Sequence, residues 1–243
     1  MNSTSSSHTD CINIHPALWR ASQLAQGRQH VVPTGYAVLN RELPSGGWPN
    51  STFIEILPAE IGTGEISLLM PALKQAVHNN QRRIIFLNCP LVPNALCWLN
   101  WQLNPNNLVW VHPKQSNQVL WATEQILRHD AGAALLVWLP LNMPLAAMRK
   151  LHLAAQRSTS LFFGIAETAH QHRSSPAPLR LGLKGAPGGI HINIIKRQGP
   201  THAGPLFIPL AFKEKSHFAF ERKAPQPHQA SNHVLLDQPL YTT

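Results

Sequence analysis

The chain has 243 residues, a length that allows one domain with a core plus tails, or two small domains. Hydrophobic residues make up 44% of it and charged residues 13%, a composition that excludes an intrinsically disordered protein. The formal net charge of +9 favours an acidic partner, either a nucleic acid or an acidic protein surface, with a merely solubilising basic face as the simpler alternative.

The first fifty residues carry few regular signals. Residues 1–14 are rich in Ser and Thr and lack an apolar run, so they predict a flexible tail without a signal peptide. Residues 15–50 predict a short helix followed by a turn-rich lead-in. Trp19 and Trp48 lie outside the later run of strands, and we expect them to contact a partner.

From residue 51 short apolar runs alternate with amphipathic stretches. The predicted strands are residues 53–57, 83–87, 108–112, 134–139 and 160–166. The predicted helices are residues 65–78, 94–103, 116–129 (with Ser116 as N-cap) and 144–157. This alternation indicates βαβ units and a mainly parallel sheet, and the continuous apolar strands imply that helices cover both of its faces. Trp110 and Trp138 lie in two of these strands, so core packing is expected for both.

The alternation of strand and helix patterns ends after residue 168. Residues 179–184 and 190–197 flank a Gly- and Pro-containing turn, which predicts a β-hairpin, and residues 206–210 predict one more strand. We therefore assign residues 51–212 to one α/β domain. Residues 213–243 are rich in His, Pro, Lys and Gln and predict a disordered tail.

The segment after the first strand has the layout of a P-loop, G-x-x-x-x-G-K-[ST], in which backbone N–H groups and a lysine hold phosphates and a hydroxyl holds Mg²⁺. Here Ala59, Gly62 and Gly64 occupy the glycine-rich part, Glu65 stands at the lysine position and Ile66 at the hydroxyl position. A carboxylate beside a phosphate repels it, so the loop is degenerate and binds no nucleotide. On this segment alone, a plain surface turn is the simpler interpretation.

Nucleotide hydrolysis needs two further carboxylates that the chain lacks. The strand at 83–87 is followed by Asn88, Cys89 and Pro90, and the strand at 134–139 ends without an Asp for Mg²⁺. A G-x-S-x-G elbow, an H-E-x-x-H motif and a C-x-x-C pair are also absent from the sequence. The sequence therefore predicts no enzymatic activity, no cofactor and no metal.

Cysteine use and hydropathy indicate a compartment. The three cysteines are an odd number, which fits a reducing cytoplasm better than a disulfide framework. The most apolar stretch, residues 131–148, is interrupted by Pro140 and Pro144 and is too short to cross a bilayer. We expect a soluble cytoplasmic protein.

The positive charge is concentrated in the second half of the chain. Between residues 131 and 210 there are eight basic residues and one acid, Glu167. The candidate contacts to a partner or to DNA are Trp19, Arg20, Arg149, Lys150, Arg157, Arg180, Lys184, Lys196 and Arg197. Contacts of this kind to phosphates depend on salt and carry no sequence information.

Several short motifs carry a family resemblance. They are LWRASQL (18–24), PTGYAVLN (33–40), LPSGGWP (43–49), EIL (55–57) with the degenerate loop, LWATEQ (120–125), LHLAAQ (151–156), APGGI (186–190) and IIKRQGP (194–200). Over about residues 15–210 the chain resembles the RecA-like superfamily. Within it, the chain is similar to ImuA-type accessory proteins of translesion synthesis and to the related SulA-type cell-division inhibitors. The centre, about 65–166, is shared with the SulA type, whereas the flanking motifs favour the ImuA type.

The resemblance implies a three-layer RecA-like α/β fold and a role in the SOS response to DNA damage. It implies a non-catalytic adaptor that works with an inactive Y-family polymerase-like protein and an error-prone replicative-type polymerase. Single-stranded DNA and RecA are further candidate partners, and no membrane is involved. The alternative is a SulA-like inhibitor that binds the tubulin-like division GTPase.

Overall fold

The structure is a computed structural model that describes residues 30–80, 82–199 and 204–210. The predicted tails at 1–14 and 213–243, and the predicted helix with Trp19 and Arg20, lie outside these residues. The described elements, in chain order, are β1 (Val31–Val32), α2 (Ala37–Glu42), η2 (Pro44–Gly46), β2 (Trp48–Pro49), β3 (Phe53–Pro58), α3 (Glu65–Asn80), β4 (Ile84–Leu87), α4 (Ala95–Asn100), η3 (Pro105–Asn107), β5 (Leu108–Val111), α5 (Ser116–Arg128), β6 (Ala134–Trp138), α6 (Leu145–Ala155), β7 (Leu161–Ile165), η4 (Thr168–His172), β8 (Leu179–Ala186), β9 (Gly189–Lys196) and β10 (Leu206–Pro209).

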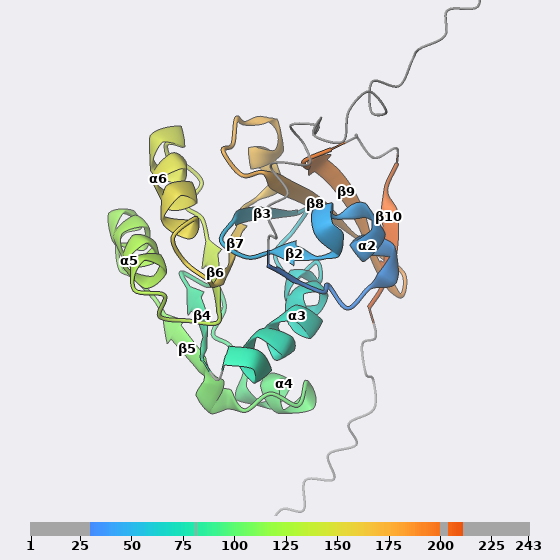
Figure 1. The fold of residues 1–243 in the computed structure, drawn as a ribbon, viewed down its shortest axis with the longest axis horizontal. Coiled ribbons are helices and arrows are strands. Elements are labelled where there is room, and N and C mark those ends of the chain that lie inside the picture. Colours follow the sequence, from blue (N-terminus) through green and yellow to red (C-terminus); the bar gives the residue numbers. More distant parts are fainter. Residues whose placement is uncertain (1–29, 81, 200–203, 211–243) are drawn as a thin grey trace, which may run out of the picture. The chain divides into compact units, whose positions relative to one another are not determined.

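An eight-stranded sheet forms the centre of the described part (Figure 1), with the strand order β10-β9-β8-β3-β7-β6-β4-β5. From β8 to β5 all neighbouring strands are parallel, and β9 runs antiparallel to both β8 and β10. Every helix and strand predicted between residues 53 and 210 is present, with ends that differ by at most three residues. The predicted mainly parallel sheet flanked by helices is confirmed.

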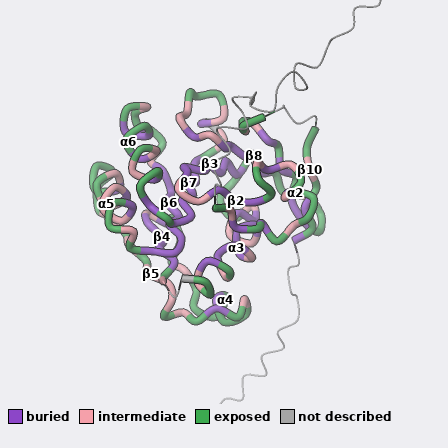
Figure 2. The backbone as a smooth tube through the Cα atoms, viewed as in Figure 1, coloured by how far each residue is buried: buried purple, intermediate pink, exposed green. Residues whose placement is uncertain are grey.

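Strand β3 shows why the sheet is covered on both faces. All six of its residues are buried, and successive side chains point to opposite faces. Ile54 and Ile56 join a core with α3 and α4, whereas Phe53 and Leu57 join a second core with α5 and α6. Figure 2 shows the buried strands between these two helix layers.

The lead-in to the sheet contains structure that the sequence did not predict. β1 pairs with β2 in a small antiparallel sheet, and α2 lies between these two strands in the chain. Trp48 of β2 is fully buried, with its ring edge against Phe163 at a centroid distance of 5.4 Å. The expectation that Trp48 contacts a partner is therefore wrong, because this side chain completes the core on the α3 side.

Two further expectations need correction. Trp110 is 42% exposed, not buried, because β5 is the last strand of the sheet and has a neighbour on one side only. Trp138, on the interior strand β6, is buried as predicted. The N-cap of α5 is Gln115 and not Ser116.

Within the described residues, no helix is both long and apolar enough to cross a membrane.

Asp130 ties together the amino ends of β4, β6 and β7. Its carboxylate accepts hydrogen bonds from Arg82 Nη1 at 2.6 Å, Ser158 Oγ at 2.7 Å, Thr159 Oγ1 at 2.7 Å and the Thr159 N–H at 2.9 Å. Burial works against the charge, but these hydrogen bonds prevail and hold the pKa of the Asp130 carboxyl well below its usual range.

We expect Asp130→Ala to lower the free energy of unfolding by about 2–3 kcal/mol at pH 7, because several charge-assisted hydrogen bonds are lost. The contribution depends on pH. Since the pKa is lowered in the folded state, the stabilisation is complete above the ordinary aspartate pKa of about 3.9 and declines as the pH falls below it. Urea unfolding of both proteins at pH 7 and pH 3 checks this: the difference between them should shrink at pH 3, and an equal difference at both pH values would contradict it.

Candidate functional site

The loop between β3 and α3 lies at the carboxyl ends of the parallel strands, where open α/β sheets bind their ligands. Gly62 and Gly64 have φ angles of +86° and +118°, which few residues other than glycine adopt. Thr63 Oγ1 donates to the Glu60 carbonyl at 2.6 Å and accepts the Glu60 N–H at 3.2 Å. The loop is therefore a closed turn that leads directly into the first residue of α3, Glu65.

The Glu65 side chain folds back onto this loop. Its Oε1 accepts the N–H of Gly62 at 3.0 Å, its Oε2 accepts the N–H of Gly64 at 3.1 Å, and the residue is only 3% exposed. Backbone N–H groups at such a turn and the positive end of the helix dipole are the features with which a phosphate-binding loop holds its anion. Here the Glu65 carboxylate accepts the N–H groups of both Gly62 and Gly64.

The surroundings hold the loop in this conformation. A Cβ atom at Gly64 would lie 2.7 Å from Leu210 Cδ1 and 3.2 Å from Ile190 Cγ2, so the loop packs closely against the end of the β9–β10 pair. The N–H of Ala59 donates to the Leu183 carbonyl at 2.8 Å and fixes the start of the loop to β8. Ile66 packs against the core on the α3 side.

A cavity of about 240 Å³ lies beside the loop, at the ends of β3, β4, β6 and β7. Its polar side chains are the carboxylates of Glu60 and Glu167, the amide of Asn88 and the imidazole of His112. Asn88 Nδ2 donates to the Trp138 carbonyl at 2.7 Å, which commits this side chain to joining β4 to β6. Among the described residues no Lys or Arg lines the cavity, so a triphosphate would meet two carboxylates and no countercharge.

Glu55 and Arg180 form a buried ion pair between β3 and β8. Arg180 Nε donates to Glu55 Oε2, and its Nη2 donates to the His170 carbonyl at 2.8 Å. The two side chains are 0% and 7% exposed, respectively. Arg180 was expected to contact a partner or DNA, and this expectation is wrong because its charge is enclosed and neutralised inside the sheet.

A small cavity of about 150 Å³ adjoins this pair. Glu55 and His170 are among its lining residues, with Met143, Met148 and Arg173. Burial and the nearby Arg173 charge lower the pKa of the His170 imidazole, so that His170 is neutral at pH 7. Within the described part of the chain, no three His, Cys, Asp or Glu side chains gather closely enough to hold a metal ion.

The remaining basic candidates divide into two groups. Arg149 and Lys150 lie on α6, with Arg157 just beyond its end, and all three are exposed. Lys184 on β8 and Lys196 on β9 are exposed on the hairpin. Lys196 Nζ donates to the Ser175 carbonyl at 3.1 Å, and burial together with the nearby Lys196 charge lowers the pKa of His152 on α6.

Arg197 follows Lys196 and is committed to a contact within the protein. Its Nη1 lies 2.8 Å from Glu42 Oε2 and also donates to the Glu42 carbonyl, which joins the end of β9 to α2. The basic residues that lie close together in the second half of the sequence therefore do not all belong to one surface.

Trp121 on α5 is a candidate that the sequence analysis did not single out. It is 65% exposed. The buried face of α5 is formed by Val119, Thr123 and Leu127, which recur every four residues. Trp121 lies two positions after Val119 and thus about 200° around the helix, so helical periodicity could have identified it.

The fold defines an α/β protein with a mainly parallel eight-stranded sheet flanked by helices. No family model matches the chain, and no curated protein matches it. The solved structures include SulA from Pseudomonas aeruginosa, which matches with 21% sequence identity and a TM-score of 0.39, over 47% of this chain and 97% of that one.

Proposed function

We propose that this chain is a non-catalytic, RecA-like adaptor of damage-induced translesion DNA synthesis, of the ImuA type. The observation that carries the proposal is the Glu65 carboxylate, which accepts the loop N–H groups of Gly62 and Gly64. In this arrangement a carboxylate already occupies two of the loop N–H groups that a phosphate would use. The adjoining cavity adds two more carboxylates, Glu60 and Glu167. A degenerate P-loop on an intact frame suits a protein that assembles others.

The proposed partners follow from the family resemblance of the sequence. They are an inactive Y-family polymerase-like protein and an error-prone replicative-type polymerase, in the cytoplasm. The exposed basic residues of α6 support an acidic partner in the same assembly. No cofactor has a role in this proposal.

Affinity capture of the full chain from DNA-damaged cells tests the adaptor role. Recovery of the two polymerase-type partners is the expected result. Recovery of the division GTPase, together with filamentation of undamaged cells that overproduce the chain, would replace the adaptor with the SulA-like alternative.

The absence of catalysis needs a separate measurement. We expect purified protein to release no phosphate from Mg·ATP and to show no micromolar binding of it in calorimetry. Turnover by the wild-type chain that disappears in Glu65→Ala would overturn the proposal, because it would make that carboxylate part of a working site.

A further inference from the structure

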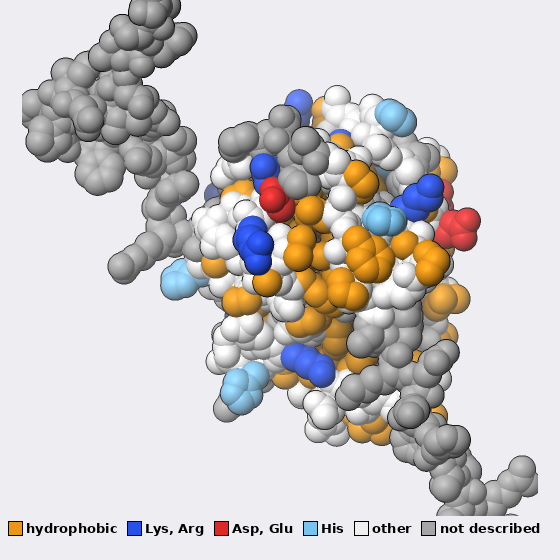
Figure 3. Space-filling view, turned by 90° about the vertical axis from the view of Figure 1, so that its right-hand side faces the viewer, with side chains coloured by type: hydrophobic (Ala, Val, Ile, Leu, Met, Phe, Trp, Pro, Cys, Tyr) orange, Lys and Arg blue, Asp and Glu red, His pale blue; other side chains and the backbone are white. Residues whose placement is uncertain are grey.

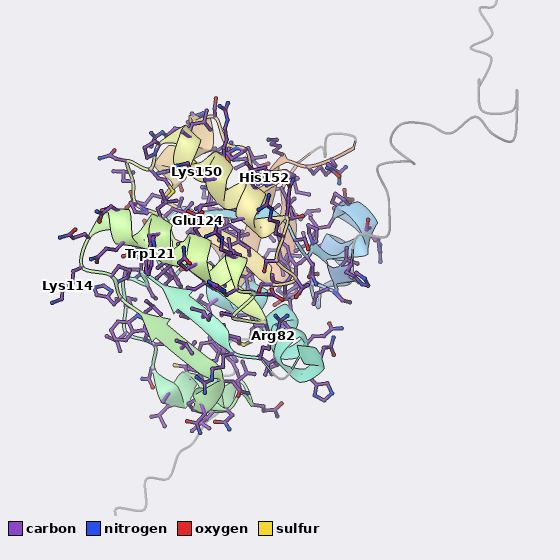
Figure 4. The ribbon with its side chains drawn as sticks, turned by 60° about the vertical axis from the view of Figure 1, so that its left-hand side comes forward. Arg82, Lys114, Trp121, Glu124, Lys150 and His152 are labelled. Carbon is purple, nitrogen blue, oxygen red and sulfur yellow. The ribbon has the colours of Figure 1, made fainter. Side chains whose placement is uncertain are left out.

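Helices α5 and α6 form one layer on the sheet. They connect successive parallel strands, they contact each other along their length and they cover the same core. Figure 4 shows this layer from outside, with Trp121 and Glu124 on α5 and Lys150 on α6. We call the outward side of the two helices the α5–α6 surface.

The α5–α6 surface is strongly basic. Its exposed cations are Arg128 on α5 and Arg149 and Lys150 on α6, with Lys114 just before α5 and Arg157 just after α6. Glu124 is the one carboxylate in the sequences of the two helices. Within the described residues none of the five cations forms an ion pair, so their charge is available to an external anion.

Two large apolar side chains stand among these cations. Trp121 is 65% exposed on α5 and Leu153 is 59% exposed on α6. The other outward positions of α5 include the amides Asn117 and Gln118. An exposed indole costs free energy in water, and this one is not part of either core.

The other end of the sheet gives a contrast. There hydrophobic side chains gather over the middle of the side that carries α2 and β10 (Figure 3). A surface of that kind suits contact with another protein. The α5–α6 surface instead combines an exposed aromatic ring with several exposed cations on the same two helices and at their ends.

We propose that the α5–α6 surface binds single-stranded nucleic acid, with Trp121 stacking on a base and Arg149, Lys150 and their basic neighbours contacting phosphates. Proteins bind single strands without sequence preference through this combination of an aromatic platform and a basic track. A duplex hides its base faces and gives Trp121 nothing to stack on. A lipid surface would require more apolar area than Trp121 and Leu153 provide.

This inference deepens the proposed function by naming the polymer on which the adaptor would assemble its partners. Its biological setting rests on that function, whereas the binding itself rests on the surface alone. The ring and the cations do not distinguish DNA from RNA, so the test includes both.

Fluorescence anisotropy measures the binding of labelled 20-nucleotide oligo-dT and oligo-U to the full chain at about 50 mM salt. Trp121→Ala should weaken it between about 5-fold and 150-fold, the range for loss of one stacked base. Trp110→Ala is the matched control, because Trp110 is also exposed but lies on the edge strand β5; it should leave the affinity unchanged. Both side chains are exposed, so unchanged thermal unfolding confirms that each variant is folded.

The charged residues are tested by a matched pair of double variants. Arg149→Glu/Lys150→Glu should weaken binding and reduce the slope of log affinity against log salt by about 1.4, since each phosphate contact to a single strand contributes about 0.7. Arg41→Glu/Lys184→Glu makes the same change of charge at two exposed positions, on α2 and β8, and should have a clearly smaller effect.

Three results would overturn the inference. If the Trp121→Ala variant binds with wild-type affinity, Trp121 does not stack on a base. Equal losses in the two double variants would indicate general attraction to a basic protein. Binding to vesicles of acidic lipid that depends on Trp121, without binding to either oligomer, would assign the surface to a membrane. Partner capture by Trp121→Ala separates the two proposals, because loss of nucleic acid with retained polymerase partners leaves the adaptor role intact.

Discussion

Glu65→Ala is expected to lower the free energy of unfolding by about 3 kcal/mol, one of the two largest effects that we predict. The substitution leaves the N–H groups of Gly62 and Gly64 without their acceptor, and an unsatisfied buried donor costs about 1–3 kcal/mol. It also removes a negative charge from the first turn of α3, where the helix dipole favours one. Urea unfolding at pH 7 measures the loss.

Two variants give this measurement its controls. Glu65→Gln keeps one acceptor oxygen but turns an NH₂ group toward the second N–H, so its loss should be intermediate. Glu60→Ala removes an exposed carboxylate from the same loop and should change stability by less than about 0.5 kcal/mol. Equal stability of Glu65→Ala and the wild-type chain would contradict the assignment of Glu65 as the internal acceptor.

The same variant tests what the loop can do once the carboxylate is gone. The freed N–H groups form an anion site at a helix N-terminus, so sulfate or phosphate should raise the melting temperature of Glu65→Ala more than that of the wild-type chain. An identical response of both proteins would show that the loop has lost the ability to bind anions for reasons other than Glu65.

The buried pair of Glu55 and Arg180 should produce the largest loss. Arg180→Met is expected to cost about 3–5 kcal/mol, because it leaves the Glu55 carboxylate buried without a countercharge. Glu55→Leu should cost a similar amount by leaving the guanidinium buried. The double variant Glu55→Leu/Arg180→Met removes both charges and should be more stable than either single variant.

A double-mutant cycle from chemical unfolding measures this coupling. Arg173→Met is the control. Arg173 is an exposed arginine that lines the small cavity beside Glu55, and its Nη1 donates to the Leu141 carbonyl at 2.6 Å. Its loss should be below about 1 kcal/mol. If the effects of Glu55→Leu and Arg180→Met are simply additive, the two side chains do not act as a pair.

These two sites have different consequences for function. The Glu55–Arg180 pair joins β3 to β8 and belongs to the structure of the sheet. The Glu65 contacts belong to the loop at the amino end of α3, where they occupy two backbone N–H groups that could otherwise hold an anion. Under the proposed function, a loop whose N–H groups are occupied in this way leaves the outer helices to contact other molecules without a nucleotide cycle.

Sequence by itself determined the order and type of the elements from residue 53 onward. Periods of two and 3.6 residues report which side of a strand or helix is apolar, and this information is local. The sequence also singled out Glu65 and Ile66, which stand at the lysine and hydroxyl positions of a contiguous P-loop-like pattern. The direction of the Glu65 side chain, which returns to the loop N–H groups, did not follow from the motif.

Only the tertiary structure decided which polar and aromatic residues are exposed. Arg180 and Lys150 look alike in sequence, but Arg180 meets Glu55 from a strand 125 residues earlier. Lys150, on the outside of α6, forms no ion pair with any residue that the structure describes. Trp110 and Trp138 lie in similar apolar runs, yet strand order places one at the edge of the sheet and the other inside it. Burial depends on neighbours brought together by the fold, and the residues adjacent in sequence do not specify those neighbours.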